Sequence, residues 1–236
     1  MRVSHRTHQG RVRASNQDSL LLDASVYGVA DGMGGHRGGE TASRVAVQVL
    51  KNALHGKQPD RRALEVGMEA ANRRIFDMSR HDSSLSGMGT TVTLLWESAD
   101  QIMLAHVGDS RAYLLRDGEL KQITDDHSMV AELVRQNVIT PEAAKTHPYR
   151  NIITRAVGVD PMVETDFLTH DKQPGDLWLI CSDGLYNMVG DDVLQQMLSG
   201  DDDEAAAEKL LQLALENGGT DNVSLVICRV TEVNGV

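Results

Sequence analysis

The sequence predicts a layered α+β domain spanning residues 1–236 as one unit. Two long stretches have helical spacing of their apolar residues, and several short apolar runs bounded by turn residues read as strands. Runs of strands combined with long helices are typical of layered α+β domains. A chain of 236 residues is also long enough to bury a substantial core as a single domain.

The first two helices are expected over residues 39–54 and 60–79. The first begins with an acidic, hydroxyl-rich turn and carries one apolar face, formed by Ala42, Val45, Ala46, Val49, Leu50, Ala53 and Leu54. The second carries an inner stripe formed by Leu64, Met68, Ala71, Ile75 and Met78. Apolar residues at this spacing are core residues rather than a cofactor site.

Strands are expected next, after a polar loop over residues 81–89. Residues 91–97 and 101–107 form one hairpin, and residues 112–123 form another that turns at Asp117-Gly118. Residues 124–150 interrupt the strand pattern with short helical segments, so we expect an insertion there. The chain ends with a helix over residues 203–215 and a strand over residues 222–230.

Five aspartates lie beside strand-like runs, where the chain changes direction. They are Asp18, Asp31, Asp109, Asp183 and Asp221. Strands of one sheet system can bring such ends together, and two unit charges about 4 Å apart repel by roughly 4 kcal/mol at an effective dielectric constant near 20. Divalent cations that prefer oxygen ligands, such as Mg²⁺ and Mn²⁺, are the natural compensation.

The dipeptide Asp-Gly is also a common hairpin turn, which leaves two interpretations open. Asp117-Gly118 lies between two alternating strands and is expected to be a plain turn. Asp31-Gly32 and Asp183-Gly184 are not followed directly by a second strand, so each is either a turn or part of a ligand site.

Composition excludes several classes of protein. A net charge of −11 argues against nucleic acid as a partner, and no apolar run approaches the length of a membrane span. The first eight residues contain no apolar signal segment, so we expect a cytoplasmic protein. The two cysteines, Cys181 and Cys228, lie within apolar runs and are expected to be buried thiols.

Seven short motifs occur in an order that resembles the PPM family of metal-dependent protein phosphatases, the PP2C type. They are residues 13–18, 29–36, 87–91, 107–111, 153–158, 181–185 and 219–224. The resemblance extends from about Thr7 to Val230 and is greatest to short bacterial members with a single domain. It implies two mostly antiparallel central sheets flanked by helices on both outer faces, in four layers, with residues 124–150 as a mobile flap that contacts substrate. The alternative for that segment is an insertion with no substrate contact.

The resemblance also implies a reaction and a set of metal ligands. Members hydrolyse phosphoserine and phosphothreonine by attack of a water or hydroxide that bridges two Mn²⁺ or Mg²⁺ ions. Asp31, Asp183 and Asp221 correspond to ligands of the first ion, and Asp31, the Gly32 carbonyl and Asp18 to ligands of the second. Asp109, with Asp183, corresponds to a weaker third site; alternatively, Asp109 is a turn carboxylate that supports Arg111.

Two further residues carry expectations about substrate. Arg13 occupies the position where the family binds the substrate phosphate, and an arginine fork suits phosphate oxygens; the alternative is an ordinary surface arginine. Eukaryotic relatives carry a proposed general acid where this chain has Met33. His36 follows three residues later, and we expect it near the site, either as the general acid or as a residue that helps position protein substrates.

The resulting hypothesis is a cytoplasmic, monomeric protein serine/threonine phosphatase. Its partners would be phosphorylated proteins and a bacterial Hanks-type Ser/Thr kinase that it opposes. A phosphohydrolase for small metabolites is a second hypothesis, although no G-x-x-x-x-G-K-[ST] nucleotide motif supports it. A catalytically inactive binding module is a third, and the presence of Asp31, Asp183 and Asp221 together counts against it.

Overall fold

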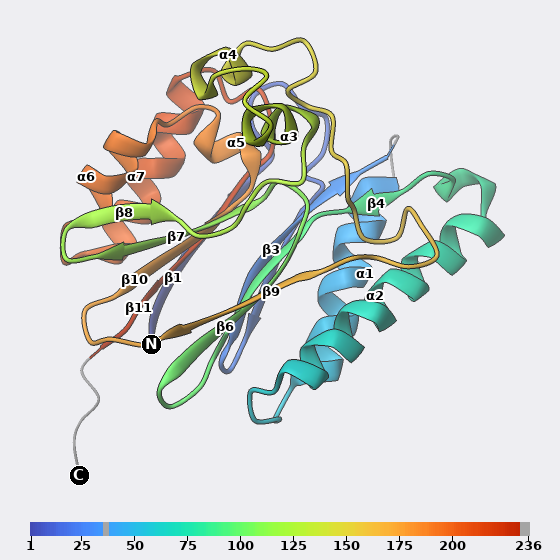
Figure 1. Ribbon diagram of the computed structural model, residues 1–236, viewed down its shortest axis with the longest axis horizontal. Helices are drawn as coiled ribbons and strands as arrows, with labels where there is room; N and C mark the ends of the chain where they lie inside the picture. The colour runs from blue at the N-terminus through green and yellow to red at the C-terminus, as the bar shows by residue number, and fades with distance from the viewer. Residues whose placement is uncertain (35–37, 232–236) are drawn as a thin grey trace.

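Two antiparallel β-sheets form the middle of the computed structural model, which describes residues 1–34 and 38–231 (Figure 1). The first sheet has five strands in the order β1-β11-β10-β7-β8. Their bounds are β1 Arg2–His8, β11 Val223–Arg229, β10 Leu177–Cys181, β7 Arg111–Arg116 and β8 Glu119–Gln122. The two ends of the chain therefore contribute neighbouring strands, because β1 pairs with β11 along its whole length.

The second sheet has six strands, in the order β2-β3-β5-β6-β9 with β4 paired to the end of β3. Their bounds are β2 Asp18–Asp23, β3 Val26–Met33, β4 Gly89–Thr90, β5 Val92–Glu97, β6 Gln101–Val107 and β9 Asp166–Asp171. The predicted hairpin of β5 and β6 is confirmed, with Val92 opposite Val107 and Glu97 opposite Ile102.

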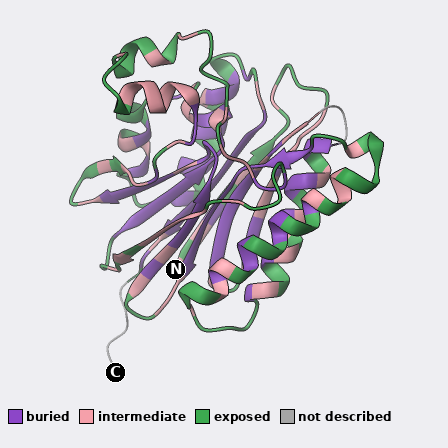
Figure 2. Ribbon diagram, turned by 45° about the vertical axis from the view of Figure 1, so that its right-hand side comes forward, coloured by how far each residue is buried: buried purple, intermediate pink, exposed green. Residues whose placement is uncertain are grey.

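The core between the sheets is formed by side chains from the facing sides of both. Val29 and Leu104 come from the second sheet, and Trp178 and Val226 from the first; all four are at most 2% exposed. Figure 2 shows the strands as the main buried layer of the molecule. Burying one aliphatic side chain of this size stabilises the fold by roughly 1.5–3 kcal/mol before entropy is counted.

Helices cover both outer faces, which confirms the predicted four-layer sandwich (Figure 1). Helix α1 (Gly38–Leu54) packs on β2 and β3, and α2 (Arg61–His81) packs on α1 through buried Leu64 and Met68. On the other face α7 (Asp203–Glu216) packs on β1 and β11, and α6 (Asp191–Leu198) packs against α7. A short helix, α5 (Asp183–Tyr186), follows β10, and a 3₁₀ turn covers Ser83–Leu85.

The β7–β8 hairpin turns at Asp117-Gly118, as predicted. Both residues have positive φ, +52° and +81°, which the common two-residue hairpin turn requires. Strand β9 does not stand out in the sequence, because its six residues include only two apolar side chains and it is half-exposed. Helix α6 has an acidic start followed by apolar residues at helical spacing, Val193, Leu194, Met197 and Leu198.

The predicted insertion lies between β8 and β9 and contains two short helices, α3 (Met129–Arg135) and α4 (Pro141–Lys145). Hydroxyl caps start both helices: Ser128 Oγ accepts a hydrogen bond from the Ala131 amide, and Thr140 Oγ1 accepts one from the Ala143 amide. A β-bridge between Ser128 and Ile153 closes the base of the insertion. We call residues 124–153 the flap.

Cys181 and Cys228 are both buried and unpaired, as their apolar settings predict. Within residues 1–34 and 38–231, no helix combines the length and the apolar character needed to cross a bilayer.

Asn72 on α2 anchors the segment that follows the flap. Its side chain is buried, donates through Nδ2 to the Asp160 carbonyl at 3.0 Å and accepts through Oδ1 from the Gly158 amide at 2.6 Å. Next to this contact, Val157 pairs with Thr90 of β4. The Asn72 amide therefore holds this loop against α2, and the Val157–Thr90 pair holds it against the edge of the second sheet.

We expect Asn72→Ala to destabilise the fold, because it leaves a buried donor and an acceptor without partners. The free energy of unfolding should fall by about 1–3 kcal/mol for each group left unpaired, measured by urea denaturation. The matched control is Asn52→Ala, which removes an exposed amide on α1 whose Oδ1 accepts a hydrogen bond of 2.9 Å from Gln48 Nε2. The control should change stability by less than about 0.5 kcal/mol. Equal losses in the two variants would contradict the anchoring role.

Candidate metal centre

Four of the five predicted aspartates line one pocket of about 420 Å³. They are Asp31, Asp109, Asp183 and Asp221, and Gly32 and Arg13 line the same pocket. Asp31 belongs to β3 in the second sheet, whereas Asp183 follows β10 and Asp221 precedes β11 in the first. The structure thus brings strand ends from both sheets together, as the spacing of the aspartates predicts.

Asp18 lies behind Asp31, one strand further from the pocket. It is the first residue of β2 and stands directly opposite Asp31 in the β2–β3 pairing. Its carboxylate is buried, and Oδ2 accepts a hydrogen bond of 2.8 Å from the Ser182 hydroxyl, next to Asp183. All five predicted carboxylates therefore gather at the same end of the sandwich.

The two ambiguous Asp-Gly pairs are explained by close approach of backbones rather than by hairpin turns. A Cβ atom on Gly32 would lie 2.1 Å from the Gly39 carbonyl oxygen, and one on Gly184 would lie 1.9 Å from the Asn222 carbonyl oxygen. A Cβ on Gly118, in contrast, would meet nothing within 4 Å. Glycine at positions 32 and 184 lets the segments of the pocket pack against one another.

Asn222 fastens the N-terminal loop to the pocket, and the sequence reasoning did not assign it a role. Its Nδ2 donates to the carbonyls of Gln9 and Ser15, both at 2.8 Å, and its Oδ1 accepts from the Gln17 amide at 2.8 Å. These three bonds hold the loop that carries Arg13 beside Asp221. The motif at residues 219–224 includes Asn222, but nothing in the sequence indicates which backbone groups it binds.

Burial and mutual repulsion make the carboxylates of this cluster hard to ionise. Burial raises the pKa of Asp18 to about 6 and that of Asp109 to about 7. It also raises the pKa of Asp31 and Asp183 well above the usual range, and the charges of Asp18 and Asp109 respectively add to this effect. A cation placed among these groups would favour their charged forms.

Arg13 supplies one positive charge to the cluster. Its Nη2 lies 2.6 Å from Asp221 Oδ2, and this hydrogen bond raises the pKa of the guanidinium above its ordinary value. The Arg13 side chain is 54% exposed. It is therefore placed at the pocket with freedom to change partner, unlike a buried structural arginine.

The donor set suits hydrated divalent cations. Asp18 Oδ1 is buried without a hydrogen-bond partner among the described atoms, so one carboxylate oxygen beside Asp31 is left without compensation. Within the described residues, no group of three or more His, Cys, Asp or Glu side chains is placed so that it could hold a metal ion. Mg²⁺ commonly binds through one or two carboxylates and keeps several waters, so open carboxylate clusters fit it. The pocket residues therefore fit Mg²⁺ or Mn²⁺.

The histidines do not contribute to the pocket where the structure describes them. His36 belongs to residues 35–37, outside the described residues, whereas Met33 lines the pocket. His106 is fully buried; its ring nitrogens lie 2.8 Å from Thr93 Oγ1 and 3.0 Å from the Asp125 carbonyl oxygen, and burial lowers its pKa to about 4. His106 is therefore a core residue whose two ring nitrogens both have polar partners.

The flap contributes two residues to the wall of the pocket, Asn151 and Ile153. Both follow the range of residues 124–150 that the sequence assigns to the flap. The bridge between Ser128 and Ile153 explains the difference, because it extends the base of the insertion by three residues beyond that range. The position of a loop over the pocket was predictable, but the residues that face inward were not.

Comparison with known proteins gives concordant matches. A family model described as protein phosphatase 2C matches residues 6–215. The serine/threonine protein phosphatase PstP of Mycobacterium tuberculosis is 40% identical over 235 residues, which is 98% of this chain and 45% of that protein. This chain thus spans about half the length of that relative. The serine/threonine phosphatase stp of Listeria monocytogenes is 36% identical over 239 residues, covering 96% of this chain and 95% of that protein.

A solved structure agrees in fold as well as in sequence. The catalytic domain of PstP in complex with two manganese ions has a TM-score of 0.91 and 38% identity, and the match covers 98% of both chains. Because the family model spans most of the sequence and these relatives align along nearly all of it, the chain belongs to the protein phosphatase 2C family.

Proposed function

We propose that this chain is a metal-dependent protein serine/threonine phosphatase, which hydrolyses phosphoserine and phosphothreonine in other proteins. The main support is the pocket at which aspartates from both sheets and one arginine meet. The names of PstP and stp, both serine/threonine phosphatases, point to the same substrates. We propose that residues 1–236 act as a single catalytic domain.

The proposed ligand assignment is the one that the resemblance to the family implies. Asp31, Asp183 and Asp221 would hold one cation; Asp31, the Gly32 carbonyl and Asp18 would hold a second. Asp109 and Asp183 would hold a weaker third. When bound, Mn²⁺ or Mg²⁺ would neutralise the phosphate and supply hydroxide near neutral pH. The two manganese ions in the PstP catalytic domain support two core ions.

The side chains of this chain would bind and orient the substrate. Neutralisation of Asp221 would free the exposed Arg13 guanidinium, which then presents two donors to the phosphate oxygens. Asn151 and Ile153 of the flap would contact the groups next to the phosphate. We assign His36 to the positioning of protein substrates rather than to general acid catalysis.

The biological setting follows from the proposed reaction. The substrates would be phosphoproteins in the cytoplasm, and the opposing enzyme would be a Hanks-type Ser/Thr kinase. We propose that the phosphatase acts as a monomer. A light-scattering mass of one chain in solution, unchanged by Mn²⁺, would support that assignment, and the mass of a dimer would contradict it.

The first prediction concerns metal removal. The protein with Mn²⁺ should hydrolyse a phosphothreonine peptide, and excess EDTA should abolish this activity, because generation of the nucleophile depends on the metal. Added Mn²⁺ should restore it. Phosphate release from the peptide and from p-nitrophenyl phosphate should be measured side by side. Hydrolysis of small esters alone would favour a metabolite phosphatase, and full activity in EDTA would overturn the metal mechanism.

The second prediction concerns Asp183→Asn. Turnover should fall by at least about 100-fold, since the variant loses a charged ligand and metal ions supply several kcal/mol of stabilisation to such reactions. In the chelated protein, the thermal midpoint should rise, because one of the mutually repelling carboxylates is gone. The matched control is Asp117→Asn in the β7–β8 turn, which should change neither quantity. Wild-type turnover of Asp183→Asn at limiting Mn²⁺ would contradict the assignment.

The third prediction separates Arg13 from the metal ligands. Arg13→Ala should raise KM for a phosphopeptide more than it lowers kcat, if the contact is equally strong in the ground and transition states. Mn²⁺ binding measured by calorimetry should not weaken, because Arg13 contacts Asp221 as a competing cation. Arg11→Ala, two residues away and outside the pocket lining, is the control. Weakened Mn²⁺ binding with an unchanged KM would assign Arg13 a structural role instead.

A further inference from the structure

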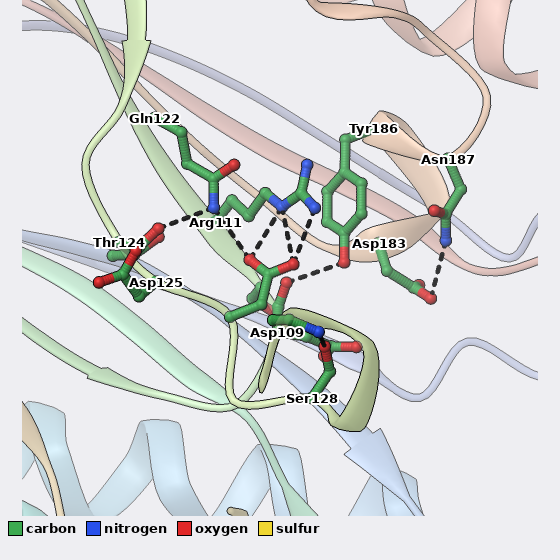
Figure 3. A network of polar contacts seen from close by, with 12 residues as sticks. Asp109, Arg111, Gln122, Thr124, Asp125, Ser128, Asp183, Tyr186 and Asn187 are labelled. Carbon is green, nitrogen blue, oxygen red and sulfur yellow. Dashed lines mark hydrogen bonds and ion pairs between the residues drawn. The ribbon is translucent and has the colours of Figure 1, made fainter. Parts of the chain in front are cut away.

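The turn that carries Asp109 is held from outside the pocket by Tyr186. The Tyr186 hydroxyl donates a hydrogen bond of 2.9 Å to the backbone carbonyl of Asp109. Tyr186 ends the short helix α5, which begins at Asp183. Figure 3 shows the Tyr186 side chain pointing to Asp109, with Asp183 on the same helical turn. One phenol therefore connects the backbone segments of two pocket carboxylates.

Arg111 holds Tyr186 in this position. The centre of its guanidinium group lies 3.6 Å from the centroid of the Tyr186 ring (Figure 3). The same guanidinium forms a two-point pair with Asp126, in which Nε lies 2.9 Å from Oδ1 and Nη2 lies 2.7 Å from Oδ2. Both side chains of this pair are largely buried. A planar fork with two bonds and a stacked face has little freedom to rotate.

Asp126 and His127 in turn belong to the base of the flap. Gln122 Nε2 donates to Asp126 Oδ1 at 2.9 Å, which fixes the carboxylate. The His127 amide donates to the Gly108 carbonyl at 2.8 Å, and its Nδ1 accepts from the Gly108 amide at 3.1 Å. His127 thus binds Gly108, which precedes Asp109, and Asp126 binds Arg111, which follows Asp109 two residues later. Two successive flap residues therefore hold the Asp109 turn from both sides.

This arrangement leaves the Asp109 carboxylate directed to the pocket. The carboxylate that forms an ion pair with Arg111 is that of Asp126, not that of Asp109. Among the described residues, Asp109 takes part in no ion pair, and it lines the pocket. Its backbone carbonyl is bound by Tyr186, while its side chain remains available to a ligand.

We propose that Tyr186 and Arg111 are positioning residues that set the spacing between the Asp109 and Asp183 carboxylates, with Asp126 as their anchor. This inference rests on the proposed function, in which these two carboxylates hold the weakest of the bound cations. Groups that orient metal ligands commonly change metal affinity by about 10–100-fold when they are removed. Tyr186 and Arg111 contact backbone and ring atoms beside the ligands, so their effect should be on affinity.

The test is a calorimetric titration of the chelator-treated protein, residues 1–236, with Mn²⁺. Tyr186→Phe removes only the hydroxyl, and Arg111→Lys keeps the charge but loses the fork. Each should weaken the weakest Mn²⁺ binding step by about tenfold and leave the tighter steps unchanged. The double variant should weaken this step by less than the product of the two single effects, because both changes act through the same tyrosine ring.

Two matched controls separate positioning from loss of stability. Tyr27→Phe removes a tyrosine hydroxyl that also donates to a backbone carbonyl, that of Ala24, in the β2–β3 turn. Arg116→Lys breaks the same kind of two-point pair, with Asp176, on the same strand as Arg111. Thermal midpoints of the metal-free proteins should fall by similar amounts in variants and controls, while Mn²⁺ binding should weaken in the variants alone.

Activity gives a second readout. Phosphopeptide turnover by Tyr186→Phe and Arg111→Lys should fall at limiting Mn²⁺ and recover at high Mn²⁺, which damage to the fold would not allow. Wild-type Mn²⁺ binding in both variants, or equal weakening in the controls, would overturn the positioning role. If the wild-type protein itself binds no Mn²⁺, the proposed function fails and this inference fails with it; failure of the variants alone leaves the proposed function intact.

Discussion

The concentration of negative charge at one end of the sandwich is the constraint on which the remaining structure depends. Asp18 faces Asp31 across β2 and β3, and the strands of the other sheet add Asp183 and Asp221 to the same region. Burial and mutual repulsion oppose ionisation there, as the raised pKa values of Asp18 and Asp31 indicate. The cluster therefore lowers the stability of the metal-free fold. The apolar layers on both sides of the sheets must offset this cost, and they are large enough to do so, because every layer contributes fully buried aliphatic side chains.

The same constraint explains why the backbone is packed so closely around the pocket. Charges from two sheets can share a small volume only if their loops approach without side chains between them, and Gly32 and Gly184 provide that approach. Asn222 then replaces the missing side-chain contacts with three hydrogen bonds to the N-terminal loop. Asparagine suits this role because it offers donors and an acceptor without adding a further charge.

The features that were predictable from the sequence are those encoded locally. The strand ends and the Asp-Gly pairs can be recognised in short stretches of the sequence. The strand order of the two sheets then places the aspartates of these strand ends in one region. The flanking strands separate Asp117-Gly118 from Asp31-Gly32 in the sequence, but the role of Gly32 required the structure, because it depends on which backbone lies opposite the glycine. The partner of Arg111 was likewise hidden. Asp126 reaches it only after the β7–β8 hairpin has reversed the chain, a contact that no short sequence window contains.

The flap combines a fixed base with an outer part that has no fully buried residue, and this difference has a consequence for substrate binding in the proposed enzyme. At its base, His127 binds both backbone groups of Gly108 and the Ser128–Ile153 bridge closes the loop. Beyond the base, α3 is half-buried, whereas α4 is largely exposed and has no buried residue, so α4 can move at a small cost in free energy. In the proposed enzyme, the outer flap could therefore adapt to different phosphoproteins while Asp109 keeps its place. Separation of the two parts allows a variable substrate surface beside a metal centre whose geometry must not vary.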